Sequence, residues 1–172
     1  MNKRLSTAFT GIIAVFSLFN FNAESLADTP DKYFCGTSSD GVPTTFVRRI
    51  TGKNLALIRW ERDDIKDFPP QKRCQLVSEN FEKASKNGYL GSITGGFWKG
   101  NKVICATKVA GGRCLQTLFT IKPNDDPDQV IKQLINVAAQ AKSTPVPQSN
   151  GTTRNYYSME DILKTLEENE EK

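Results

Sequence analysis

The sequence predicts an α+β domain, a small antiparallel sheet built from two three-stranded meanders, each followed by an α-helix and stapled by disulfides. Three observations carry this prediction. Short β-prone segments separated by turn residues occur in two groups, an amphipathic helical pattern follows each group, and four cysteines are spread over the chain. Strands and helices that come in separate runs indicate an α+β architecture rather than a parallel α/β sheet.

The first 27 residues have the composition of a cleavable export signal. A short basic start, Asn2-Lys3-Arg4, precedes a mostly apolar run over Leu5–Phe21, and Ser25-Leu26-Ala27 supplies the small residues that a signal peptidase recognises. The apolar run is short for a membrane span and is interrupted by hydroxyl side chains. We therefore expect cleavage before Asp28 and a protein that works outside the cytoplasm.

Three β-prone segments open the mature chain. Turn residues bound them, Ser39-Asp40-Gly41 after the first and Thr51–Asn54 after the second, which favours tight antiparallel connections. The predicted strands are Lys32–Thr37, Thr44–Ile50 and Leu55–Glu61.

An amphipathic helix is predicted to follow this first meander. Pro69-Pro70 suits its first turn, and Asn87-Gly88 ends it because Gly accepts the left-handed cap conformation. Apolar residues recur between these limits at helical spacing: Cys74, Val77, Phe81 and Ala84. Cys74 therefore lies on the predicted buried stripe, which favours a structural role.

A second group of strands and a second helix complete the predicted domain. Leu90–Trp98 and Lys102–Thr107 flank Gly100-Asn101, a favoured two-residue hairpin turn, and a further strand lies within Cys114–Lys122. The helix that follows has three start signals and an apolar periodicity that continues to about Ala141. These signals are Asp126 as N-cap, Pro127 at the first helical position and Gln129 completing a capping box.

The chain divides into a signal (1–27), a folded domain (28–142), a linker (143–157) and an acidic tail (158–172). The domain is mildly basic. The linker is rich in Ser, Thr, Pro, Asn and Gly and is predicted to be flexible. Ser158 is a candidate cap for a short helix in the tail. This helix would dock on its own domain, bind a partner or stay unfolded, because an isolated helix of this length is marginal in water.

The four cysteines of an exported chain indicate two structural disulfides, and three pairings are open. We prefer Cys105 with Cys114, which flank the loop between consecutive strands. Cys35 would then pair with Cys74 and tie the first strand to the first helix. A zinc site or a redox pair would require Cys-x-x-Cys or histidine spacing, which the sequence lacks, so we expect neither a metal nor a cofactor.

Catalytic candidates are few, because the sequence contains no histidine and therefore no Ser-His-Asp or Cys-His machinery. Carboxylates remain, notably Asp63 and Asp64 before the first helix and the acidic group at 125–128 before the second. Two carboxylates can hydrolyse a glycoside or bind calcium. Acidic residues before helices more often satisfy free backbone N–H groups. We therefore favour a non-catalytic role, with an enzyme of envelope glycans as the alternative.

Candidate binding residues are aromatic and basic side chains that are neighbours in the sequence. Phe97-Trp98 precedes Lys99, and Trp60 follows Arg59, so each pair would suit a sugar or peptide platform. The ordinary interpretation of each pair is a core tryptophan with charged neighbours on the surface. A third hypothesis is a small protease inhibitor that presents Arg113 on the loop Ala110–Arg113, closed by the predicted Cys105–Cys114 disulfide.

Several motifs together resemble a known family. They are Tyr33-Phe34-Cys35-Gly36, Leu57-Ile58-Arg59-Trp60, Pro70-Gln71-Lys72-Arg73-Cys74, Val103-Ile104-Cys105 with the second cysteine at 114, Leu118–Pro123, and the helix after Asp126-Pro127. This combination resembles the cyanobacterial circadian oscillating protein family from about Tyr33 to Ala141, with the linker and tail outside it. The resemblance implies a daily rhythm in abundance and peripheral membrane association, without an established activity or catalytic residues to carry over. It also implies a cyanobacterial host.

These observations predict an exported protein that binds its partner rather than transforming it. The expected location is the periplasm, the thylakoid lumen or the medium. The expected partner is an extracytoplasmic protein or an envelope component, with peripheral membrane contact and with the acidic tail as a second contact. Export makes nucleic acid the poorest partner for the mildly basic domain.

Overall fold

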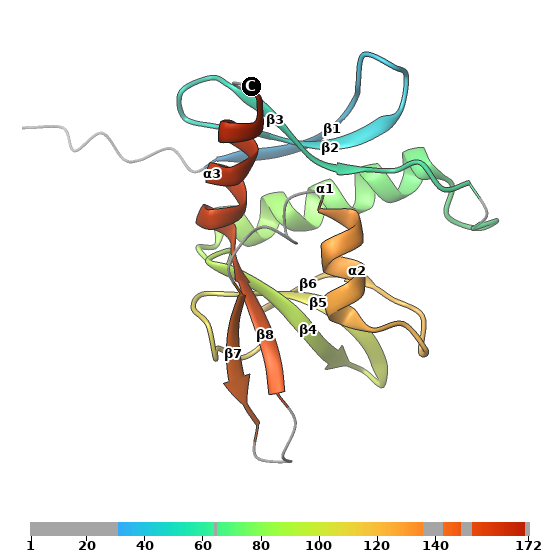
Figure 1. The fold of residues 1–172 in the computed structure, drawn as a ribbon. Helices are drawn as coiled ribbons and strands as arrows, with labels where there is room; N and C mark the ends of the chain where they lie inside the picture. Colours follow the sequence, from blue (N-terminus) through green and yellow to red (C-terminus); the bar gives the residue numbers. More distant parts are fainter. Residues whose placement is uncertain (1–30, 64, 136–142, 149–152, 171–172) are drawn as a thin grey trace, which may run out of the picture.

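The computed structural model describes residues 31–63, 65–135, 143–148 and 153–170, and it confirms the α+β class. Figure 1 shows two sheets with helices packed between them. Both sheets are antiparallel, one of three strands from the first part of the chain and one of five strands from the remainder. One buried cluster of apolar residues joins both sheets and the three described helices. The predicted export signal lies outside the described residues.

The smaller sheet is the predicted first meander. Both of its connections are tight turns with a glycine at positive φ, Gly41 at 86° and Gly52 at 87°. Glycine adopts this conformation without a steric penalty, so these two positions fix where the chain reverses. The strands, in their order across the sheet, are β1 (Lys32–Thr37), β2 (Pro43–Arg48) and β3 (Asn54–Arg59).

Helix α1 (Pro70–Lys86) packs against the smaller sheet through the predicted stripe. Its buried side chains are Cys74, Val77, Ser78, Phe81 and Ala84. The Phe81 ring stacks on Tyr33 of β1, with centroids 5.5 Å apart. The predicted disulfide between Cys35 and Cys74 joins β1 to α1 covalently. The smaller sheet and α1 therefore form two packed layers that a disulfide joins.

The three strands of the second predicted meander form the centre and one edge of the larger sheet. Lys99 and Gly100 form the turn of its first hairpin with φ of 48° and 79°, and Trp98 pairs with Asn101. Two residues at positive φ meet the requirement of a type I′ turn. The predicted turn at Gly100-Asn101 is therefore shifted by one residue. The strands are β4 (Ser92–Trp98), β5 (Asn101–Thr107) and β6 (Gln116–Thr120).

Two further strands extend this sheet beyond β4, and they lie in the segment predicted to be a flexible linker. They are β7 (Ser143–Pro147) and β8 (Thr153–Ser158), and the sheet order is β6-β5-β4-β8-β7. The linker prediction is wrong for these residues. Tyr156 and Tyr157 are buried and hold β8 in the sheet, whereas the prolines Pro145 and Pro147 lie on an outer edge strand, where a missing N–H is tolerated.

Helix α2 (Pro127–Leu134) starts as predicted and ends early. The Asp126 carboxylate accepts a hydrogen bond of 2.9 Å from the Gln129 N–H, with Pro127 at the first helical position. The predicted end near Ala141 is wrong, because Ile135 already has extended backbone angles. Residues 136–142 lie outside the described part of the chain.

Helix α3 (Met159–Glu170) is formed by the acidic tail and docks on its own domain. The Ser158 hydroxyl accepts a hydrogen bond of 3.3 Å from the Asp161 N–H, which confirms the predicted cap. The apolar side of the helix is buried through Met159, Ile162, Leu163 and Leu166 and lies against β3 and β8. In the described ranges, no helix is both long and apolar enough to cross a bilayer.

Removing the Cys35–Cys74 disulfide is expected to destabilise the fold more than removing Cys105–Cys114. The two bridges join residues 39 and 9 positions apart. Loop-closure entropy then gives about 4 kcal/mol for the longer loop and about 3 kcal/mol for the shorter. Urea unfolding of the two double-alanine variants measures the order. The reverse order, or no loss in either variant, would contradict this prediction.

Ile162→Ala is expected to lower the free energy of unfolding by about 2–5 kcal/mol, because the side chain is fully buried between α3 and the rest of the core. Lys164→Ala on the exposed side of the same helix is the matched control and should change stability little. Equal stability of the two variants in urea would show that α3 does not belong to the cooperative core.

Candidate functional site

Trp60 belongs to the core, so the prediction that it forms an exposed platform is wrong. Only 4% of its surface is accessible. Its indole N–H donates a hydrogen bond of 3.0 Å to the Thr45 hydroxyl, which in turn accepts one from the Ser78 hydroxyl. The buried polar atom is thereby satisfied, as a core tryptophan requires. The charged neighbours of Trp60 in the sequence point elsewhere.

Phe97 and Trp98 are exposed, as predicted, and end β4 at the tip of the β4–β5 hairpin. Their exposed fractions are 68% and 54%. Successive side chains of a strand point to opposite faces of the sheet, so the two aromatic rings flank the hairpin tip rather than forming one flat platform. Lys99 follows them in the turn and is also exposed. We call Phe97, Trp98 and Lys99 the aromatic tip.

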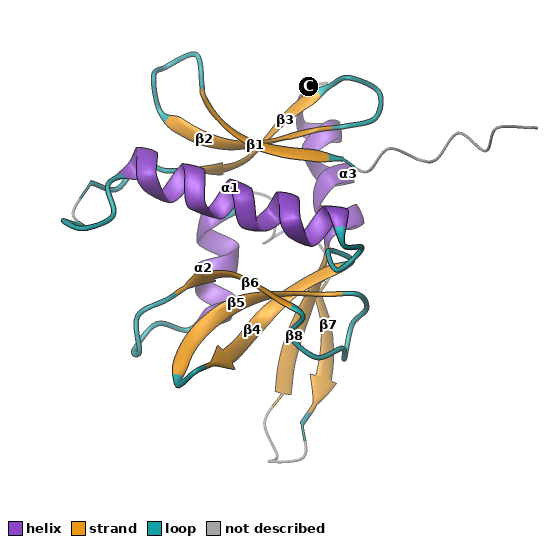
Figure 2. Cartoon of the chain, turned by 180° about the vertical axis from the view of Figure 1, so that it is seen from behind, coloured by secondary structure: helices purple, strands orange, loops and turns teal. Residues whose placement is uncertain are grey.

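A groove opens beside the aromatic tip, because β4 and β8 run together for only part of their length. Ser92, Ile93 and Thr94 pair with β8, and the two strands then diverge, as Figures 1 and 2 show from opposite sides. The groove has a volume of about 420 Å³. Its walls are residues 95–97 of β4, residues 126–128 at the start of α2 and residues 153–155 of β8, with Lys102 and Gln148. We call it the β4–β8 groove.

The first turn of α2 lies at the point where the strands separate. A Cβ atom at Gly95 would come within 2.4 Å of the Pro127 Cβ, so only glycine allows the helix to start this close to β4. The Asp128 carboxylate accepts a hydrogen bond from the Asn155 side chain of β8. The Thr94 hydroxyl donates to the Asn155 carbonyl at 2.6 Å, where a ladder bond would otherwise continue.

Tyr157 is buried next to this point and does not supply acid–base chemistry. Burial, with the neighbouring carboxylates of Asp128 and Asp126, raises the pKa of Tyr157 to about 12. Its hydroxyl has no hydrogen-bond partner among the described residues. The negative charge of the nearby Asp128 carboxylate makes ionisation of this hydroxyl less favourable. The side chain therefore stays protonated at neutral pH.

Sequence reasoning missed the walls of the groove that come from β8 and α2. The segment Thr153–Ser158, with two adjacent tyrosines between polar residues, carries a strand signal that the surrounding Ser, Pro, Asn and Gly composition outweighed. Pro127 and Asp128 were predicted only as helix-start residues. Their proximity to β4 follows from tertiary packing and has no local signature.

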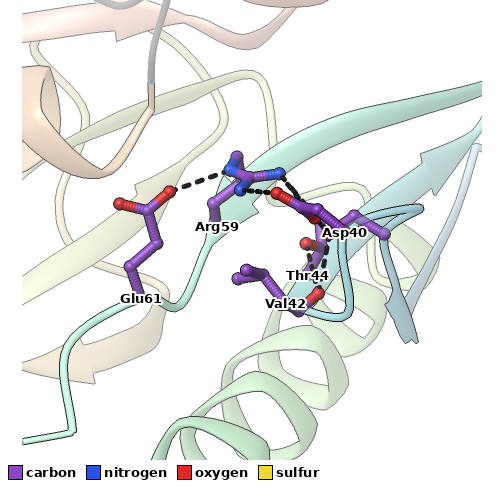
Figure 3. A network of polar contacts seen from close by, with 6 residues as sticks. Asp40, Val42, Thr44, Arg59 and Glu61 are labelled. Atoms are coloured by element: carbon purple, nitrogen blue, oxygen red, sulfur yellow. Dashed lines mark hydrogen bonds and ion pairs between the residues drawn. The ribbon is translucent and has the colours of Figure 1, made fainter.

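Arg59, predicted as a binding residue, is engaged in the fold. Figure 3 shows its guanidinium between two carboxylates, with contacts of 2.6 Å to Asp40 and 3.0 Å to Glu61. The Ser38 hydroxyl donates to Asp40 at 2.6 Å and to the Val42 carbonyl at 2.9 Å. The network ties the β1–β2 turn to the end of β3. The Arg59 guanidinium and the Ser38 hydroxyl hold the pKa of Asp40 well below its usual range.

The carboxylates considered as catalytic candidates serve local structure where the structure describes them. Asp126 caps α2, Asp128 binds Asn155, and Asp125 accepts a hydrogen bond of 3.2 Å from the Lys122 N–H. Asp63 is exposed, and Asp64 lies outside the described residues. Among the described residues, no cluster of acidic or cysteine side chains has the geometry of a metal site.

The loop that carries Arg113 is a compact turn closed by the Cys105–Cys114 disulfide. The Gly112 N–H donates to the Val109 carbonyl at 3.0 Å, and the Tyr156 hydroxyl donates to the Gly112 carbonyl at 3.2 Å. Arg113 itself is exposed, as the inhibitor hypothesis requires.

A larger cavity of about 630 Å³ lies where the start of β1, the β2–β3 turn and the start of α3 meet. Two of its charged residues bind each other, since Arg49 of the turn pairs with Asp31 before β1; Arg49 also contacts Glu167 of α3 at 2.9 Å. These ion pairs connect the two ends of the described chain.

Comparison with known proteins gives one match. A family model described as circadian oscillating protein COP23 matches residues 32–164. The matched range includes β7, β8 and the start of α3, and so extends beyond the resemblance drawn from the sequence motifs. No curated protein and no solved structure matches the chain.

Asp40 is expected to titrate well below a normal aspartate, and Arg59→Gln should raise its pKa toward the ordinary value, with the Ser38 hydroxyl still lowering it. Because the folded-state pKa is lowered, the contribution of this pair to stability is present above the unfolded-state pKa and is lost as the pH falls toward the folded-state value. A carboxyl-carbon NMR titration of both proteins measures the difference. An unshifted Asp40 in the wild-type chain would contradict the network.

Proposed function

We propose, from the premise that the chain belongs to the circadian oscillating protein COP23 family, that it is an exported, non-catalytic binding protein whose abundance follows a daily rhythm in a cyanobacterial host. The proposed contact surface is the aromatic tip, formed by Phe97, Trp98 and Lys99. The proposed partner is an extracytoplasmic protein or an envelope component at a membrane surface.

The two disulfides support an extracytoplasmic location. Disulfides persist in oxidising compartments and are rare in the reducing cytosol. Cys74 and Cys105 are fully buried, so both bridges are built into the core rather than displayed at the surface. The composition of residues 1–27 points to the same location, with the periplasm, the thylakoid lumen and the medium as the candidate compartments.

The exposure of Phe97 and Trp98 is the observation that carries the binding role. Large aromatic side chains dominate the energetics of protein interfaces, and tryptophan is the residue most enriched at their centres. Here the rings are held on a short hairpin with a two-residue turn, so little conformational entropy is lost when they are covered. The same arrangement, with Lys99 next to the rings in the turn, suits peripheral contact with a membrane interface.

The helix of the acidic tail docks on its own domain, which is one of the three alternatives drawn from the sequence. Its apolar residues Met159, Ile162, Leu163 and Leu166 are buried in the domain. The exposed side of α3 remains acidic. We therefore assign partner binding to the aromatic tip and structural completion to α3.

Phe97→Ala/Trp98→Ala is expected to reduce retention of the oxidised chain on envelope and thylakoid membranes by roughly tenfold or more. Ile50→Ala/Val109→Ala is the matched control, because these residues are exposed to a similar extent, 64% each, away from the aromatic tip. Co-sedimentation with fractionated host membranes, followed by crosslinking, measures retention. Equal retention of wild type and the aromatic variant would overturn the proposal, and vesicles of extracted lipid alone separate lipid contact from protein contact.

A further inference from the structure

The β4 wall of the groove is an open strand edge. Lys102 of β5 lies opposite Phe97, and its carbonyl accepts a hydrogen bond of 3.0 Å from the Ile121 N–H on the far side of β5. In an antiparallel pair, two residues that lie directly opposite each other behave alike. The main-chain N–H and C=O groups of both point either toward the other strand or away from it. The N–H and C=O of Phe97 therefore point away from β5, toward the β4–β8 groove.

Hydrogen bonds nearer to α3 show where β4 pairs with β8. The carbonyl of Gly91, just before β4, accepts from the Met159 N–H at 3.1 Å and so points to the β8 side, whereas the Gly91 N–H donates to the Thr107 carbonyl of β5 at 3.0 Å. Ile93 pairs with Tyr157 of β8. In the described part of the chain, pairing on this side stops at Thr94. The edge from Gly95 to Trp98 is left without a strand partner.

Helices protect the other strand edges. Glu82 of α1 accepts a hydrogen bond of 2.8 Å from the N–H of Tyr33 in β1. Asn80 of α1 donates one of 2.9 Å to the carbonyl of Leu118 in β6. Helix α3 lies against β3. Natural proteins cover or block strand edges in such ways because an open edge pairs with other chains.

Prolines protect the outer edge of β7. Pro145 and Pro147 lie opposite Asn155 and Thr153, and the main-chain groups of these two β8 residues face the β4 side. The two prolines therefore occupy the β7 positions that point outward, where an N–H would otherwise be offered. Against these four protected edges, the open segment of β4 beside the exposed Phe97 is an exception.

We propose that the exposed end of β4, at Phe97 and Trp98, binds an extended peptide segment of a partner protein by strand pairing in the β4–β8 groove. This inference rests on the proposed binding function and specifies the chemistry of its partner. Strand addition takes its affinity from main-chain hydrogen bonds and its specificity from pockets for alternate side chains. Gly95 and Gly96 are buried beside the start of α2, so the guest backbone meets the edge at Phe97.

The groove favours uncharged, apolar side chains on the guest peptide. A strand paired with β4 places alternate residues on the face of Phe97 and Pro127 and the others on the face of Trp98. Three of the charged groups that line the groove are already bound, since Lys102 donates to the Asp125 carbonyl at 3.0 Å, Asp126 caps α2 and Asp128 binds Asn155. The aromatic rings on opposite faces of the tip then each cover one side of the guest.

A single extended segment suits this groove better than a second copy of the chain. Strands β8 and β7 lie on the open side of β4, so a folded sheet edge with its own neighbours would be blocked. A linker or terminal segment without strand neighbours has no such obstruction.

Amide hydrogen exchange of the oxidised, exported chain tests the open edge first. The amide of Phe97 is expected to exchange much faster than that of Trp98, whose main-chain groups face β5. A linear peptide selected on this chain from a phage-displayed random dodecapeptide library should slow the exchange of Phe97. Protection of Phe97 without peptide, or a library that yields no binder sensitive to residue 97, would overturn the inference.

Two substitutions at one position separate main-chain pairing from side-chain contact. Phe97→Ala removes the ring, whereas Phe97→Pro removes the ring and the N–H that points into the groove, leaving the β4–β5 ladder intact. We expect Phe97→Pro to bind the selected peptide about tenfold more weakly than Phe97→Ala, the effect of one main-chain hydrogen bond. Equal urea midpoints of the two variants verify that both fold.

The two proposals fail in different experiments. Equal peptide affinity of Phe97→Ala and Phe97→Pro would overturn strand pairing, while loss of membrane retention in Phe97→Ala/Trp98→Ala would still support the binding role of the aromatic tip. Retention that is insensitive to both rings would overturn the proposed function even if a library peptide binds the groove. If Phe97→Pro unfolds, a second experiment takes its place, in which the residues of the selected peptide are N-methylated one at a time. Strand pairing predicts that the affinity of the peptide for the chain falls at every second peptide position.

Discussion

The packing of α1 between the two sheets is the contact on which the rest of the molecule depends. A three-stranded sheet has no core of its own and must bury its apolar face against another layer. The stripe formed by Cys74, Val77, Phe81 and Ala84 supplies that layer, and Asn80 on the same helix reaches β6 of the larger sheet. With the Cys35–Cys74 bridge in place, the position of α1 sets the spacing of both sheets. The groove and the aromatic tip are built on the sheet that this helix supports.

Local chemistry was sufficient to predict the elements whose determinants lie within them. The meander turns rest on Gly41 and Gly52, and the start of α2 rests on Asp126 and Pro127, so each was visible in the sequence. The disulfide pairing followed from the positions of the predicted strands and helix. The aromatic tip was visible for the same reason, because Phe97 and Trp98 end a strand next to a hairpin turn.

The elements that sequence reasoning missed depend on distant partners. β8 is a strand because Tyr156 and Tyr157 are buried against β4, which lies far away along the chain, and the composition of the intervening segment conceals this. Trp60 shows a different limit. The sequence left both a core position and an exposed platform open, and the Thr45 hydroxyl inside the core decides between them because it satisfies the indole N–H and permits burial. The groove was only partly visible in the sequence. Its β4 wall was predicted as a strand, whereas the walls from α2 and β8 depend on packing between distant parts of the chain.

The ion pairs of Arg49 have a consequence for the order of folding. Arg49 holds Glu167, 118 residues further on, and α3 closes a core that begins with β1. Contacts this distant along the chain form slowly, because a long loop must be ordered before they are gained. The strands of the smaller sheet are joined by tight turns, so we expect them to pair before α3 docks on β3.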